Sequence, residues 1–167
     1  MKLLLTFLLS LSLLNGLSAQ DQAILEIRKL YNETQINKDS YSRTTQNDFE
    51  NSSEGGEITA FKDVNGIRLI ETIYYGHLGK SENEYYFAEG QLYFAFVKNY
   101  RYNAPPTQPE YDHTKTTKEE YRYYFWNNNM IRCIQPDGTY MNTNTEDFEY
   151  HKQRISSLAD IAMEQID

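Results

Sequence analysis

The sequence predicts an α+β domain, in which an antiparallel meander of about six strands lies between an N-terminal and a C-terminal helix. Apolar residues recur at helical spacing over about 21–37 and about 144–166. Between about 57 and 141, short alternating runs are separated by Gly- and Asn-containing turns. Such an order is typical of α+β folds, and we expect the helices to cover one face of the sheet. The chain of 167 residues has the length of one domain, which we place at 20–167.

Residues 1–19 are predicted to be a secretory signal peptide. Lys2 provides the positive charge, an apolar run over 3–14 follows, and small residues lead to a cleavage site after Ala19. The alternative is an uncleaved anchor, but the apolar run is shorter than the roughly 20 residues that span a bilayer. No later stretch approaches that length. We therefore expect a secreted or periplasmic protein without membrane insertion after signal cleavage.

The first helix of the domain is predicted over 21–37. Ile24 and Ile27 begin an apolar stripe at helical spacing, with charged residues on the other side. The polar segment 38–56 that follows predicts a loop, with an edge strand around 41–45 as an option.

Alternating runs joined by short turns predict the strands. The run 91–102 carries bulky side chains in both phases, so we expect it to be the central strand. The segment Asn103–Lys118 then holds three of the four prolines and predicts a long exposed loop, a kind of segment that often has a function. The predicted strands are 58–62, 67–75, 82–88, 91–102, 119–126 and 130–135.

The closing helix is predicted over about 144–166. The sequence from Thr143 to Glu146 fits a capping box, in which both side chains satisfy free amides at the helix start. Phe148 and Ile155 belong to its apolar stripe.

Charge and composition exclude several functions. Acidic residues outnumber basic ones by 24 to 16, giving a net charge of −8, so we expect no nucleic-acid partner. The single cysteine, Cys133, lies in the apolar phase of a strand and is predicted to be buried, with an intermolecular disulfide as the alternative. His77, His113 and His151 are scattered without metal-ligand spacing. We therefore expect no metal site and no cofactor.

Fifteen tyrosines are an unusual number for this length, and several stand in adjacent pairs within predicted strands. Adjacent strand residues point to opposite faces, so one tyrosine of each pair should face the core and the other an open face. Such a face suits binding, although aromatic pairs can equally serve to stabilise the sheet. A shift of one residue in strand phase would instead select Tyr75, Tyr85 and Tyr123. The binding candidates are Tyr74, Tyr86, Tyr124 and Trp126.

These observations favour a non-enzymatic extracytoplasmic binding or interaction module that uses the Tyr-rich sheet face and the Asn103–Lys118 loop. Its partner would be an envelope protein or a glycan. One alternative is an enzyme that acts on envelope glycans through a carboxylate pair, since such hydrolases use two carboxyl groups at a set separation. Another alternative is a structural or assembly protein whose sheet face is buried in a homodimer. The carboxylate candidates are Glu82, Glu84, Glu119 and Glu120.

Two segments of the sequence resemble each other, 85–92 and 123–130. Each contains Tyr-Tyr-Phe, a tight turn, and then Leu or Met. This pattern resembles the strand-turn-strand units of MORN-type repeat proteins, and the resemblance implies two copies of a hairpin unit. The alternative is that aromatic hairpins with Gly or Asn turns look alike. The order of elements along the chain also resembles small secreted bacterial proteins of uncharacterised function, which implies no activity.

Overall fold

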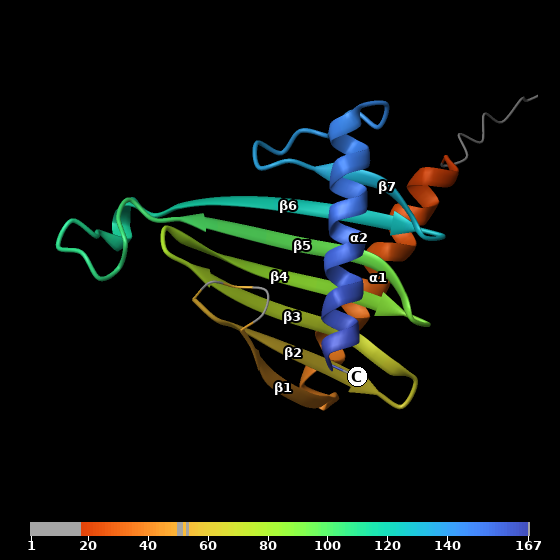
Figure 1. Ribbon diagram of the computed structural model, residues 1–167. Coiled ribbons are helices and arrows are strands. Elements are labelled where there is room, and N and C mark those ends of the chain that lie inside the picture. Colours follow the sequence, from red (N-terminus) through yellow and green to blue (C-terminus); the bar gives the residue numbers. More distant parts are fainter. Residues whose placement is uncertain (1–17, 50–51, 53, 167) are drawn as a thin grey trace, which may run out of the picture.

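A seven-stranded antiparallel sheet lies between two helices in the computed structural model, which describes residues 18–49, 52 and 54–166 (Figure 1). The strand order β1 to β7 follows the sequence, so every strand pairs with its neighbour along the chain. This confirms the predicted α+β fold. Residues 1–17 of the predicted signal peptide lie outside the described residues, so that segment stays a prediction.

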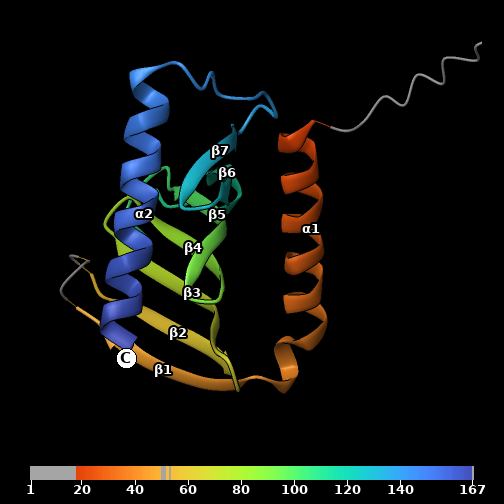
Figure 2. The same cartoon turned by 90° about the vertical axis from the view of Figure 1, so that its right-hand side faces the viewer.

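The two helices lie on opposite faces of the sheet, and both run from the β7 edge towards the β1 edge (Figure 2). The expectation that both would cover one face is therefore wrong. The physical reason is that a second apolar cluster, which includes Leu69, Tyr86 and Phe94, lies on the face opposite α2 and needs a cover of its own. No helix among the described residues is long and apolar enough to cross a membrane.

The predicted elements are present, with one more strand than expected. The optional edge strand forms as β1, which moves the centre of the sheet from the predicted run 91–102 to β4. The helices are α1 (Ala19–Asn37) and α2 (Glu146–Ile166), and the strands are β1 (Ser42–Asp48), β2 (Gly56–Asp63), β3 (Gly66–Gly76), β4 (Gly79–Ala88), β5 (Gln91–Arg101), β6 (Thr117–Trp126) and β7 (Asn129–Ile134).

The two similar sequence segments form equivalent hairpins, β4–β5 and β6–β7. Each turn has two residues with positive φ: 53° and 75° at Glu89 and Gly90, and 49° and 61° at Asn127 and Asn128. Two such residues define the type I′ turn, whose twist matches that of paired strands. The strand register also shifts at the same place in each hairpin, directly after the Tyr-Tyr pair.

The core under α2 is the larger of two apolar clusters. Ala159 and Ala162 face the sheet and have small side chains, which lets the helix approach the strands closely. Cys133 lies in this cluster with none of its surface exposed, which confirms its predicted burial. The helix is capped by Thr145, whose Oγ1 accepts a hydrogen bond from the Phe148 amide, and not by the predicted Thr143.

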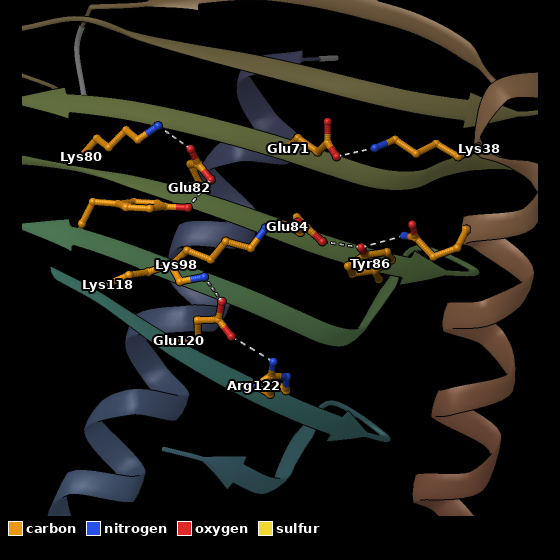
Figure 3. A network of polar contacts seen from close by, with 12 residues as sticks. Lys38, Glu71, Lys80, Glu82, Glu84, Tyr86, Lys98, Lys118, Glu120 and Arg122 are labelled. Atoms are coloured by element: carbon orange, nitrogen blue, oxygen red, sulfur yellow. Dashed lines mark hydrogen bonds and ion pairs between the residues drawn. The ribbon is translucent and has the colours of Figure 1, made fainter. Parts of the chain in front are cut away.

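The core under α1 is rich in aromatic rings. The first turn of α1 is capped by Ser18, whose Oγ accepts a hydrogen bond from the Asp21 amide. Ile24 and Ile27 of the predicted stripe pack on Tyr86 and other rings of β4, β5 and β6. α1 crosses the sheet near the ends of the strands, so part of this face carries no helix (Figure 3).

Candidate functional site

Charged side chains fill the part of the α1 face that the helix leaves uncovered (Figure 3). The strand register aligns them in three rows across β4, β5 and β6, because residues directly opposite each other share a face. We refer to these residues as the charged grid. Its rows are Lys80–Tyr100–Lys118, Glu82–Lys98–Glu120 and Glu84–Phe96–Arg122.

The first carboxylate of the grid, Glu82, accepts from two side chains. Lys80 Nζ lies 2.6 Å from Glu82 Oε1, and Tyr100 donates its hydroxyl hydrogen to Glu82 Oε2 at 3.1 Å. The Lys80 ammonium also lies 4.8 Å from the centre of the Tyr100 ring, a cation–π distance. These contacts fix the position of the carboxylate at the surface.

The second carboxylate links the grid to α1. Glu84 accepts from Lys98 Nζ at 2.7 Å and from the Tyr86 hydroxyl at 2.5 Å. Gln35 of α1 donates in turn to the Tyr86 oxygen at 2.9 Å. The phenol is fully buried, and burial and the nearby Glu84 charge raise its pKa well above the ordinary value of 10.0. Tyr86 therefore stays protonated and connects the grid to the helix.

The third carboxylate, Glu120, is shared by two cations. Lys118 Nζ lies 2.6 Å from one oxygen, and Arg122 Nη2 lies 3.1 Å from the other. The Arg122 guanidinium also lies 4.7 Å from the centre of the Phe96 ring, while Lys98 Nζ lies 4.6 Å from the same centre. Two cations therefore flank one aromatic ring.

The acidity of these carboxylates decides what chemistry they can perform. Burial would raise the pKa of Glu82, but hydrogen bonds from Lys80 and Tyr100 outweigh it and hold the pKa below the ordinary value of 4.5. The hydrogen bond from Lys118 and the neighbouring Arg122 likewise lower the pKa of Glu120. A glycosidase acid needs a raised pKa, so these groups suit ion pairing better than proton donation.

The four carboxylate candidates do not form one group. Glu82 and Glu84 share a strand face, as predicted, and Glu120 lies on that face too. Glu119 is the next residue along β6 and therefore points to the opposite side of the sheet.

A cavity of about 320 Å³ lies where α1 meets the sheet beside the grid. Aromatic rings from the helix and the sheet make up half of its lining, and polar groups enter from each side. We refer to it as the corner pocket. It is lined by Ile27, Arg28, Tyr31 and Asn32 of α1, Phe94 and Phe96 of β5, and Arg122 and Tyr124 of β6.

The tyrosine candidates lie on both faces of the sheet. Tyr86 and Tyr124 face α1, with 0 % and 7 % of their surface exposed. Tyr74 faces the opposite side, where Asp48 accepts its hydrogen bond, and burial raises its pKa. Trp126 is 37 % exposed, and it lines a cavity of about 570 Å³ beside α1. Tyr86 and Tyr124 lie largely beneath the helix and offer little surface to a partner. Binding through the four candidates stays a prediction.

The alternative tyrosine set is divided in the same way. Tyr85 and Tyr123 lie in the core under α2. Tyr123 pairs with His151 of that helix, with 2.9 Å between its hydroxyl oxygen and Nδ1. Tyr75 is 46 % exposed and stands beside Lys80, at the end of the first row of the grid.

The three histidines lie in different parts of the fold. His77 lies in the turn after β3, His113 in the connection after β5, and His151 on α2. Within residues 18–49, 52 and 54–166, no group of three or more His, Cys, Asp or Glu side chains could hold a metal ion.

The basic half of the grid was not predicted from the sequence. The signal was present in the alternation Lys-x-Glu-x-Glu over 80–84 and Lys-x-Glu-x-Arg over 118–122, since a period of two puts all these charges on one strand face. Three of the ion pairs join residues two apart on one strand, and only the Lys98–Glu84 pair depends on the cross-strand register, which distant parts of the chain set together.

The comparisons with known proteins add no relative. No family model matches the chain, and neither the curated proteins nor the solved structures include a significant match. The resemblance to MORN-type hairpins therefore stays a prediction.

Proposed function

We propose that this protein is a non-enzymatic extracytoplasmic binding module that contacts an envelope protein or glycan through the charged grid. The observation that carries the proposal is a sheet face left uncovered, on which paired contacts fix the charged side chains before any partner arrives. A surface ordered in advance loses less side-chain entropy on binding. The expected signal peptide supports an extracytoplasmic location.

The connection between β5 and β6 supports the predicted role of the Asn103–Lys118 loop. It leaves the sheet next to the row that contains Tyr100 and Lys118. Within it, the Asn103 side chain donates to the Glu110 carbonyl at 2.7 Å and accepts from the Asp112 amide at 2.9 Å. We include this ordered loop in the proposed contact surface.

The two alternatives are less well supported by the geometry. A hydrolase needs a carboxyl group poised to donate a proton, whereas the pKa values of Glu82 and Glu120 are lowered. A homodimer through the grid would bury a charged surface, whereas homodimer interfaces are usually apolar.

The proposal is tested with a pair of matched double variants. Tyr75→Ser with Lys118→Ser alters the exposed end of the grid, where 46 % of Tyr75 and 48 % of the Lys118 side chain are accessible. Tyr150→Ser with Lys152→Ser removes the same residue types from α2, on the opposite face. The proteins, beginning at Gln20, are crosslinked in envelope extract and incubated separately with insoluble envelope glycan.

We expect the wild type and the α2 variant to retain the same partner in stoichiometric amount and the grid variant to lose it. Retention by the grid variant, or equal loss by both variants, would contradict the proposal. Turnover of labelled glycan that depends on Glu82 or Glu84 would instead support the hydrolase, and a dimer by light scattering that the grid variant dissociates would support the assembly protein.

A further inference from the structure

The corner pocket has the size and the wall of a site for a small ligand. Its volume of about 320 Å³ lies at the lower end of the range for ligand sites, about 300 to 1,000 Å³. At about 30 Å³ for each water molecule in the liquid, this volume equals that of roughly ten waters, which suits a ligand with one ring. Tyr31, Phe94, Phe96 and Tyr124 provide aromatic walls from α1, β5 and β6, which favours a flat apolar ligand.

Two guanidinium groups reach this pocket with hydrogen-bonding capacity to spare. Arg122 donates one hydrogen bond to Glu120, and a guanidinium has five N–H groups. Its guanidinium carbon lies 4.7 Å from the centre of the Phe96 ring, which also lines the pocket. Arg28 enters from α1 and makes no hydrogen bond or ion pair within the part of the chain that the structure describes. The Asn32 amide lies on the same wall.

The charge around the pocket is positive, although the protein is acidic. Glu84 balances Lys98, but Glu120 is shared by two cations, and Arg28 adds a third. The acidic residues of α1 lie elsewhere. Asp21 pairs with Arg132, and Glu26 and Glu33 line the cavities on the other flank of the helix. The basic side chains of this corner are Arg28, Lys98, Lys118 and Arg122, and the acidic ones are Glu84 and Glu120.

We propose that the corner pocket binds a small aromatic carboxylate, with the ring between the aromatic walls and the carboxylate on Arg122 and Arg28. Guanidinium groups match carboxylates because two N–H groups can donate in parallel to two oxygens. The inference rests on the proposed function, because it takes the α1 side of the sheet as the binding surface, and it adds the chemical class of a ligand.

The probe is benzoate, with benzamide as a neutral molecule of the same shape and inorganic phosphate as an anion without a ring. Dissociation constants are measured by titration calorimetry at low ionic strength, with two-dimensional amide spectra to locate the site. We expect benzoate to bind at least about ten times more tightly than benzamide, because a charge-assisted hydrogen bond is about twice as strong as a neutral one. Phosphate should compete weakly, since it cannot use the aromatic walls.

Variants then assign the binding to the pocket. Arg122→Gln and Arg28→Gln should each weaken benzoate binding by about ten-fold, as expected for loss of a charged hydrogen bond. Lys29→Gln is the matched control, because it also removes one positive charge from α1, and Lys29 pairs with Glu26 and does not line the pocket. It should change the affinity by less than about three-fold, because exposed charges act weakly at a distance. Arg28 is exposed on the helix, so its variant avoids loss of the fold.

Equal affinity for benzoate and benzamide, displacement of benzoate by an equal concentration of phosphate, or equal loss in the Lys29 and Arg28 variants would each overturn the inference. These outcomes are distinct from failure of the proposed function, which is judged by the Tyr75/Lys118 double variant and a captured partner. If the grid captures a partner but the protein does not bind benzoate, the proposed ligand class is wrong and the proposed contact surface still stands.

Discussion

Tyr86 shows how one buried phenol joins the helix, the sheet core and the surface. Its hydroxyl donates to Glu84 and accepts from Gln35, while its ring lies 5.0 Å from that of Tyr31, centre to centre. Because the residue has no exposed surface, replacing it affects the fold before it affects any binding.

Tyr86→Phe should therefore lower the free energy of unfolding by about 1 to 2 kcal/mol, since it removes two hydrogen bonds and keeps the ring. Tyr86→Ser should cost about 3 to 5 kcal/mol, because it also leaves a cavity. Urea denaturation measures both. Tyr75→Phe is the matched control, and because its side chain is 46 % exposed, the effect should stay within about 0.5 kcal/mol. Equal changes in the free energy of unfolding for Tyr86→Phe and Tyr75→Phe would show that the hydrogen bonds of Tyr86 do not stabilise the fold.

Glu82 makes the stability of the folded protein depend on pH. Its pKa in the folded protein lies below the ordinary value of 4.5, so the folded state binds fewer protons than the unfolded state in this range. Its contribution is therefore present above about pH 4.5 and is lost as the pH falls through the folded pKa.

We expect Glu82→Gln to make the fall in unfolding free energy shallower between about pH 5 and pH 3. Lys80→Gln should act in the same direction, because Lys80 donates to this carboxylate. Denaturation midpoints across that pH range measure the slope. A wild-type slope in both variants would show that the ion pair does not contribute to acid unfolding.

At the scale of the elements, the turn between β4 and β5 holds a residue whose substitution should raise stability. Glu89 has a φ of 53°, in the left-handed region that costs an ordinary residue about 1 to 2 kcal/mol. Asparagine tolerates this region, and Asn-Gly is the preferred pair for a type I′ turn.

Glu89→Asn should therefore raise the free energy of unfolding by about 0.5 to 1 kcal/mol. Glu110→Asn also removes one acidic side chain, but from the exposed loop and at a residue without a positive φ. It is the control for charge and should change stability by less than about 0.5 kcal/mol. Thermal and urea unfolding measure both, and no gain over this control would contradict the turn assignment.

Local signals in the sequence predicted these elements well, because spacing and turn residues act over short distances. The Glu89-Gly90 turn and the helix predicted over about 21–37, which the structure shows as Ala19–Asn37, followed from such signals. The start of α2 was less predictable, since Thr143 and Thr145 are both capable caps and the path of the preceding chain decides between them. The faces that the two helices cover depend on packing between distant parts of the chain.

The same limit applies to the candidate site. That Glu82 and Glu84 share a face follows from strand period alone. Lys80 follows from the same period, but Lys98, the partner of Glu84, could not be assigned, because the cross-strand register decides which cation meets this acid. The corner pocket also needs α1 to cross β5 and β6 at one particular place, and no local pattern encodes that position.

For the whole molecule, the thiol of Cys133 reports on global unfolding. The side chain lies in the sheet core under α2 with none of its surface exposed, and burial raises its pKa to about 12. Since the thiolate is the reactive form, the folded protein should resist a thiol reagent at neutral pH.

We expect the rate of modification by a disulfide reagent to follow the opening of the whole sheet, and therefore to rise with urea as the unfolded population rises. The fully unfolded chain is the control and should react completely. Fast modification of the native protein, or disulfide-linked dimers on a non-reducing gel, would contradict the burial of Cys133 in solution.

The position of the single tryptophan gives this molecule a second, optical reporter. Trp126 shares its cavity with Glu26 and Leu30 of α1, whereas Cys133 lies on the side of the sheet that α2 covers. Emission of the indole therefore records whether α1 is packed on the sheet, while thiol modification records the opening of the whole sheet. Detachment of α1 and global unfolding can be timed separately in one protein without any added label.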